Sequence, residues 1–130
     1  MPRAYTIAAA AVTLRTSIKW LDNVLSHYHV SGVMQKHQGV SRRFTVEGLV
    51  VLALAVLLIQ ELGLTTPRAI AVAEDLAKNQ GRFAASRGLN LVLDISSFRA
   101  ELLERLESAV EIAPVPRRGR PPKNRTGRLV

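Results

Sequence analysis

The chain has 130 residues, 48% of them apolar, which is enough for one domain with a packed core plus an arm or tail. It has no cysteine, which excludes disulfides, thiolate metal sites and thiol redox chemistry and fits an intracellular protein. The net charge of +8 is unevenly distributed, with +5 on residues 1–45, −3 on residues 46–116 and +6 on residues 117–130. Positive charge gathered at both ends is typical of proteins that neutralise nucleic-acid phosphates; acidic proteins and anionic membranes are rarer alternatives.

Two short helices separated by a tight turn are predicted near the N-terminus. Thr6 can cap a helix over Ile7–Val12, and a second helix is expected over about Ser17–Leu25 after a polar break. The buried face of the second helix is expected to carry apolar residues at spacings of three and four: Ile18, Leu21 and Leu25. Such a helix pair is typical of a helix-turn-helix.

Basic and hydroxyl residues lie away from this apolar face. Arg15, Thr16 and Lys19 occupy the side that would enter a groove of DNA. Lys and Arg bond guanine edges or phosphates, whereas Thr and Ser usually hold phosphate. The alternative is that these are ordinary solvated surface residues.

The segment after the second helix predicts a two-stranded hairpin, over Val30–Met34 and Val40–Phe44. Lys36 and His37 lie in its turn, and Arg42 and Arg43 lie on its return strand. A hairpin with this charge can act as a wing on the phosphate backbone. The histidines lack the cysteine or clustered carboxylates that would complete a metal site, so we expect no metal.

The most apolar stretch predicts a buried helix over Val46–Leu62. Every residue from Leu49 to Ile59 is apolar, but eleven helical residues span only about 16 Å, roughly half of a bilayer's hydrocarbon core. Thr45 can act as N-cap and Gly63 as a left-handed stop. No signal peptide is recognised, so we expect a cytoplasmic protein without a membrane span.

The following residues predict a helix from the cap Thr66 to Lys78, a short helical turn at residues 82–87 and a strand over Leu89–Ile95. The strand must pair within its own chain or with a second copy. A helix capped by Ser96 or Ser97 should then extend to about Val110, with one apolar stripe formed by Phe98, Leu102, Leu106 and Val110. This stripe either folds back on the domain or meets its equivalent in a dimer, and we favour the dimer, because two recognition helices can read two half-sites.

The C-terminal residues 113–130 have four prolines, two glycines, six basic residues and no acids, and we expect them to be disordered when free. Within this tail, Arg118-Gly119-Arg120-Pro121 followed by Pro122-Lys123 resembles the AT-hook, which implies binding in the minor groove of A·T-rich DNA. Glycine permits close approach to the groove floor, and arginine is attracted by its negative potential. A nonspecific basic tail is the alternative.

Residues Tyr5–Leu76 resemble the winged helix of the MerR-type regulators. The resemblance is carried by Tyr5-Thr6-Ile7, Thr16-Ser17-Ile18-Lys19-Trp20, Arg42-Arg43-Phe44-Thr45, Glu61-Leu62-Gly63-Leu64 and Ala69-Ile70. It implies DNA binding by Arg15, Thr16, Ser17, Lys19, Arg42 and Arg43. The first turn lacks the family's usual glycine and the strand over Leu89–Ile95 is foreign to its coiled coil, so we carry over the fold and DNA binding, but not promoter untwisting or ligand sensing.

Together these features predict a mainly α protein with a small β wing: a winged helix-turn-helix at residues 1–80, a strand and helix for dimerisation or partner contact at 81–112, and a basic tail at 113–130. We expect a dimeric, sequence-specific regulator of transcription in the nucleoid, without cofactor or metal. The alternatives are a nucleoid-associated architectural protein and an antitoxin that grips a protein partner through residues 89–110. An enzyme is not expected, because no nucleophile–base set, phosphate loop or carboxylate pair is visible. The expected DNA contacts are Arg15, Thr16, Ser17, Lys19, Lys36, His37, Arg42, Arg43, Arg117, Arg118, Gly119, Arg120, Pro121 and Lys123.

Overall fold

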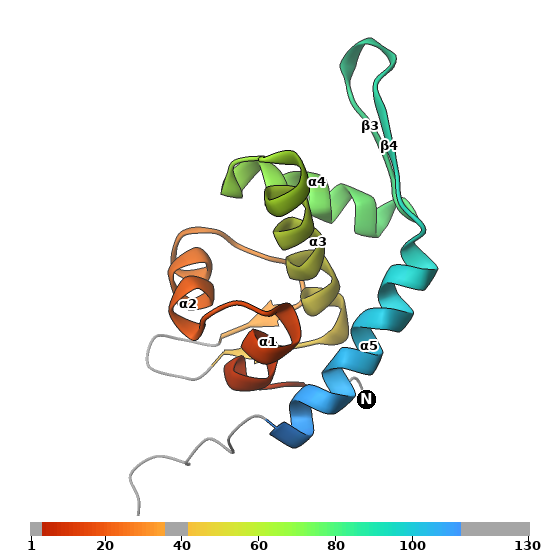
Figure 1. Cartoon of the computed structure of the whole chain (residues 1–130). Coiled ribbons are helices and arrows are strands. Elements are labelled where there is room, and N and C mark those ends of the chain that lie inside the picture. The colour runs from red at the N-terminus through yellow and green to blue at the C-terminus, as the bar shows by residue number, and fades with distance from the viewer. Residues whose placement is uncertain (1–3, 36–41, 113–130) are drawn as a thin grey trace, which may run out of the picture.

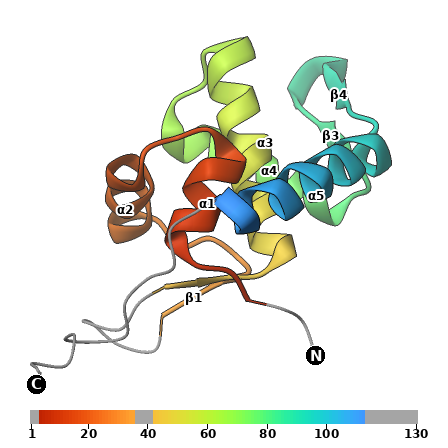
Figure 2. The ribbon, with the colours of Figure 1, turned by 60° about the horizontal axis from the view of Figure 1, so that its bottom comes forward.

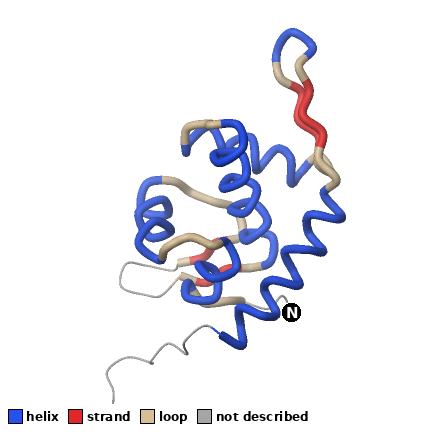
Figure 3. The backbone as a smooth tube through the Cα atoms, in the orientation of Figure 1, coloured by secondary structure: helices blue, strands red, loops and turns tan. Residues whose placement is uncertain are grey.

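Five α-helices and two β-hairpins make up the part of the chain that the computed structural model describes, residues 4–35 and 42–112 (Figures 1 and 3). Each hairpin forms its own two-stranded antiparallel sheet. The expected mainly α fold with a small β-sheet is thus confirmed. The elements in order are α1 (Ile7–Leu14), α2 (Ile18–His27), β1 (Val33–Met34), β2 (Arg43–Phe44), α3 (Val46–Leu62), α4 (Thr66–Lys78), β3 (Arg82–Ala84), the short 3-10 helix η1 (Ser86–Gly88), β4 (Asn90–Val92) and α5 (Ile95–Ile112).

Helix α3 is the centre of the core, as its sequence predicts. All seven residues of Leu49–Ala55 are buried, and α1, α4 and α5 pack around the helix (Figures 1 and 2). Thr45 Oγ1 accepts a hydrogen bond from Gly48 N at 3.2 Å, and Gly63 ends the helix with φ 67°. Within residues 4–35 and 42–112, neither α3 nor any other helix combines the length and apolar character needed to cross a bilayer.

Helix α5 folds back along its own chain. Of its predicted stripe, Leu102 and Leu106 are buried, Phe98 is half-buried and Val110 is 38% exposed. Ala109 is also buried, and the helix packs against α1 and α3. The buried alanines Ala9 and Ala10 permit the close approach of α1 and α5. The centre of the apolar stripe that we expected at a dimer interface is therefore covered within the chain, which is the fold-back alternative.

The start of α5 differs from the prediction. The helix begins at Ile95, and Asp94 rather than Ser96 or Ser97 provides its cap: Asp94 Oδ1 accepts from Ser97 N at 3.1 Å and Oδ2 from Ser97 Oγ at 2.9 Å. These hydrogen bonds, above all that from the Ser97 backbone, hold the pKa of Asp94 below its usual range. Thr65, not Thr66, is likewise the N-cap residue of α4.

Helix α2 buries a face that only partly matches the one predicted. Leu21 and Val24 are buried, whereas Ile18 is 47% exposed and Leu25 is only half-buried. The helix lies at one side of the domain instead of in its centre (Figures 1 and 2), so it needs only a narrow apolar stripe.

The first hairpin is shorter than predicted but includes an additional segment. Val33 pairs with Phe44 and Met34 with Arg43. Tyr5 joins the outer edge of β2 through hydrogen bonds from Tyr5 N to Phe44 O at 2.7 Å and from Phe44 N to Tyr5 O at 2.9 Å. The N-terminal segment and the hairpin are thus held together over the buried Phe44 side chain.

The second hairpin corrects the prediction at residues 82–87. Residues Arg82–Ala84 form strand β3 instead of a helical turn, and they pair antiparallel with β4. The predicted strand over Leu89–Ile95 shortens to Asn90–Val92 and finds this partner in its own chain.

An ion pair joins the start of α3 to α5. Arg99 Nη1 donates to Glu47 Oε2 at 3.0 Å, and this hydrogen bond lowers the pKa of Glu47. Both side chains are well exposed, so the pair contributes no more than about 1 kcal/mol to stability.

Two glycines form a close backbone joint between the first hairpin and α3. Gly32 O accepts from Thr45 N at 3.0 Å and from Thr45 Oγ1 at 2.8 Å. A Cβ on Gly48 would lie 2.6 Å from Gly32 O, and one on Gly32 would lie 2.4 Å from Gly48 N. Only glycine at both positions permits this contact, which sets the hairpin against the start of α3.

We predict that Gly48→Ala destabilises the protein by about 2 kcal/mol, because the added methyl overpacks the backbone joint. In an ordinary helix interior the same change would stabilise by roughly 0.5–1 kcal/mol. Urea unfolding followed by circular dichroism measures the difference, with the exposed Ser108→Ala in α5 as a control expected to be near neutral. Unchanged or increased stability of Gly48→Ala would contradict the joint.

Candidate nucleic-acid interface

The turn between α1 and α2 places an arginine where the backbone is left-handed. Arg15 has φ 57° and ψ 42°, its N–H donates to Val12 O at 3.2 Å, and Thr16 N donates to Ala11 O at 3.0 Å. These hydrogen bonds cap the C-terminus of α1 through a left-handed residue, a position that glycine usually occupies. The Arg15 side chain is exposed and stands immediately before α2.

The N-terminus of α2 is a positively charged surface. Ser17 Oγ accepts a hydrogen bond from Trp20 N at 3.0 Å and so caps the helix. No acidic residue lies in the first turn, and both Arg15 and Lys19 are exposed beside it. The helix dipole and the two cations together favour an anion such as phosphate.

The outward face of α2 is open to solvent. Lys19, Asn23 and Ser26 lie opposite the buried Leu21 and Val24, and with Ser17, Trp20 and Asp22 they line a shallow depression. Asn23 was not among the predicted contacts, although its position four residues after Lys19 places it on the same helix face. Its amide can donate and accept hydrogen bonds, as adenine recognition requires.

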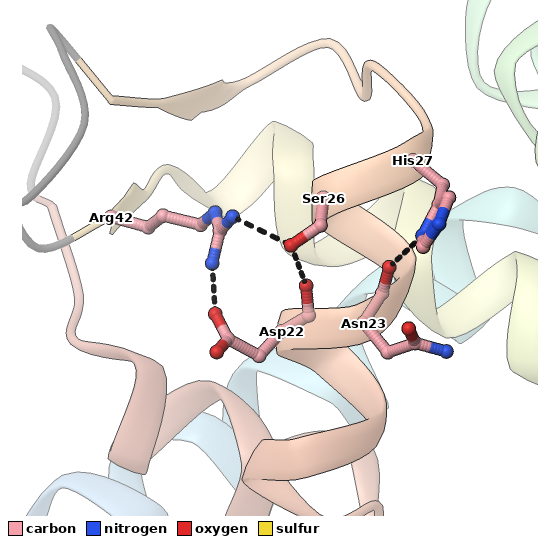
Figure 4. A network of polar contacts seen from close by, with 5 residues as sticks. All are labelled: Asp22, Asn23, Ser26, His27 and Arg42. Atoms are coloured by element: carbon pink, nitrogen blue, oxygen red, sulfur yellow. Dashed lines mark hydrogen bonds and ion pairs between the residues drawn. The ribbon is translucent and has the colours of Figure 1, made fainter.

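An ion pair attaches the return strand of the hairpin to this face (Figure 4). Arg42 Nη1 bonds Asp22 Oδ1, and Arg42 Nη2 donates to Ser26 Oγ at 3.5 Å. The Arg42 side chain is only 15% exposed. Arg42 therefore positions the segment beside α2 and neutralises the sole acid of that helix, instead of offering the free charge that we expected it to present to a phosphate.

The other predicted DNA contacts differ in whether the structure leaves them exposed. Ser17, Lys19 and Arg43 are exposed, as is Arg15. Thr16 is not available as predicted, because its Oγ1 is buried and has no hydrogen-bond partner within the described part of the chain. Several predicted contacts lie outside the described residues: Lys36, His37, Arg117, Arg118, Gly119, Arg120, Pro121 and Lys123.

The chain matches no protein-family model, no curated protein and no solved structure. Its function is therefore inferred from the chemistry of this surface. Within residues 4–35 and 42–112, no three His, Asp or Glu side chains are grouped so that they could hold a metal ion. His27 instead shares a hydrogen bond between its Nδ1 and Asn23 O at 2.9 Å, at the end of α2. What the surface offers is exposed cations, a helix N-terminus and an amide, the groups that bind phosphates and base edges.

We predict that Arg15→Gly stabilises the protein by about 1 kcal/mol, because glycine adopts the left-handed conformation without a Cβ clash. Arg15→Ala keeps the clash and removes the same charge, so it is the matched control and should leave stability near that of the unchanged chain. Thermal and urea unfolding of the three proteins make the comparison. Equal stability of the Gly and Ala variants would show that Arg15 carries no backbone strain.

Proposed function

We propose that the chain is a sequence-specific, double-stranded DNA-binding regulator of transcription that acts as a dimer. Helix α2 enters the major groove, and the β1–β2 hairpin lies as a wing on the adjacent backbone. The observation that carries this proposal is the Arg42–Asp22 pair, which holds β2 against the outward face of α2. The pair thereby brings the strand that carries the exposed Arg43 close to the helix that carries the exposed Lys19.

Each exposed group has a distinct task in this proposal. Arg15 and the α2 N-terminus with Ser17 bind a phosphate at the groove edge, and Arg43 binds a phosphate under the wing. Lys19 and Asn23, one helical turn apart, reach the base edges. The left-handed backbone at Arg15 fits this division, because strained conformations occur at functional sites and the proposal uses the charge of this residue.

The order of elements supports the likeness to MerR-type regulators. Helix, turn, helix, hairpin and two further helices follow one another from Ile7 to Lys78. In this comparison Arg15 stands in the turn where that family usually has glycine. The proposal extends to the winged helix-turn-helix fold, DNA binding and a location in the nucleoid, and it does not include promoter untwisting or ligand sensing.

The position of α5 supports a second contact through the basic tail. Its last turns lie beside α1, the helix that precedes the turn into α2 (Figures 1 and 2). A tail that starts there can bind an adjacent A·T-rich minor groove while α2 holds the major groove. Tethering then raises affinity through effective concentration.

The two alternative functions fit the described residues less well. A discrete outward face with Asn23 and Lys19 favours a defined site over the spreading coverage of an architectural protein. An antitoxin would contact its partner through residues 89–110, and of these Leu102 and Leu106 are buried within the chain, whereas Leu89 and Val92 are exposed. Footprinting separates the regulator from the architectural protein: a regulator protects a short symmetric site, and an architectural protein protects an extended region.

We predict that Lys19→Ala and Arg43→Ala each weaken binding to a selected DNA site, Lys19→Ala by about 1–3 kcal/mol with relaxed sequence preference. Arg43→Ala should instead weaken binding to all sequences and reduce the salt slope by about one unit. Lys78→Ala, an exposed cation at the end of α4, is the control and should bind unchanged. Fluorescence anisotropy over a salt series, on a site selected from random DNA, provides the measurement. Equal losses of DNA affinity in all three variants would show that only net charge matters and would contradict the proposed site.

We predict that a chain ending at Pro116 binds the same selected sites more weakly and with a smaller salt slope. The truncation removes six basic residues, so fewer counterions are released on binding. Selection from random DNA with both forms should also show that flanking A·T preference disappears with the tail. An unchanged affinity and salt slope would exclude the tail from the interface.

A further inference from the structure

The β3–β4 hairpin projects from the domain between α4 and α5 (Figure 1). At its base, the Arg68 guanidinium lies 5.8 Å from the centre of the Phe83 ring. On the other strand side, Leu89 is 64% exposed and Val92 is 75% exposed, more than any other large apolar residue in the described part of the chain. A two-stranded hairpin alone is marginally stable in water, so these exposed groups call for a partner.

The two edges of this hairpin differ in charge. Strand β3 begins with Arg82, and Arg87 follows it in the connection between the strands. The residues Leu89–Leu93 on the β4 side carry no charge, no proline and no glycine. Charged side chains discourage strand pairing and an uncharged edge invites it, so β4 is the edge open to another strand.

The hydrogen bonds within the hairpin show which backbone groups the β4 edge presents. Leu93 N donates to Gly81 O at 2.7 Å, and Ala85 N donates to Leu89 O at 2.7 Å. In an antiparallel pair such positions alternate, so residues 89, 91 and 93 turn their backbone groups toward β3. The N–H and C=O groups of Asn90 and Val92 therefore point outward.

We infer that β4 pairs antiparallel with β4 of a second copy of this chain, across a two-fold axis at Leu91. Asn90 then exchanges two hydrogen bonds with the second copy's Val92, and the symmetric pair exchanges two more. Leu91 faces its own equivalent at the axis, and Leu89 faces the second copy's Leu93. The result is a four-stranded sheet, β3-β4-β4-β3, with the charged β3 strands on its outer edges.

This edge is complementary to itself in shape and in charge. The register covers the exposed Leu89 with a half-buried leucine of the second copy. It also sets Gly88 opposite the second copy's Asp94, so Arg87 approaches an exposed carboxylate. Leu102 and Leu106 of the α5 stripe are already buried within the chain, so they are not available to a second copy. The edge pairing supplies the dimer interface instead.

The hairpin lies on the opposite side of the domain from α2 (Figures 1 and 2). Pairing through β4 therefore leaves both α2 surfaces uncovered. This interface supplies the dimer that the proposed function requires. The inference rests on the proposed function only in that respect. The interface is small, so the dimer should dissociate on dilution.

Proline substitutions test the edge. Val92→Pro removes an outward N–H without breaking a bond to β3, and Ala84→Pro is the matched control at the equivalent position of the β3 edge. Light scattering over a concentration series should show that the unchanged chain and Ala84→Pro dimerise, whereas Val92→Pro raises the dimer dissociation constant at least about tenfold. Circular dichroism and thermal unfolding establish that both variants are folded. A monomeric unchanged chain, or a Val92→Pro dimer of unchanged affinity, overturns the inference.

Single cysteines test the register, since the chain has none of its own. Leu91→Cys places two sulfurs on a non-hydrogen-bonded pair, whose Cα separation of about 4.5 Å suits a disulfide. Mild oxidation should cross-link Leu91→Cys and not Ala84→Cys on the outer edge. Dimers without this cross-link would overturn the register. Dimerisation without DNA binding would remove the proposed function alone. DNA binding by a chain that stays monomeric would remove this interface and the dimeric part of the proposed function, and would leave DNA binding itself in place.

Discussion

A helix that is apolar on every side must be covered on every side, and α3 imposes this requirement on the rest of the chain. The buried run Leu49–Ala55 draws α1, α4 and α5 around it. The close approach of α5 to α1 in turn requires the small side chains of Ala9 and Ala10. Helix α2 and the first hairpin are left at the periphery, where polar and charged side chains remain exposed. The candidate interface is thus a consequence of how the core is filled.

The elements that could be predicted are those whose signals lie next to each other in the chain. Helix α3 begins and ends at Val46 and Leu62 as predicted, because the apolar run is flanked directly by Thr45 and Gly63. Strand β3 was not predicted, because Arg82–Ala84 has no strand pattern of its own and becomes extended only through its pairing with β4. The buried face of α2 was predicted only in part: Leu21 is buried as expected, but Val24, not Ile18 or Leu25, is the second fully buried residue. In these cases tertiary contacts override local preference.

The same distinction applies to the candidate site. The exposure of Arg15, Lys19 and Arg43 follows from the apolar pattern of the flanking residues. The ion pair of Arg42 with Asp22 does not follow from that pattern, because the two residues lie 20 positions apart and only the folded chain brings them together. Charge counting treats Arg42 as one more phosphate ligand, whereas its geometry makes it the residue that attaches the hairpin to α2. The backbone strain at Arg15 also cannot be predicted from the apolar pattern of the sequence, because it arises from the left-handed conformation that the tight turn requires.

Helix α5 connects the two surfaces that the proposals concern. It starts at the base of the β3–β4 hairpin and ends beside α1, so it crosses the domain from the proposed dimer edge toward the candidate DNA interface (Figure 1). Its packing on α1 and α3 makes this connection part of the core. A dimer formed at β4 would therefore hold its two α2 helices at a separation set by packed helices. The spacing between the two DNA half-sites would then be fixed by the packing of the core helices, since residues 42–112 contain no long flexible linker that could change it.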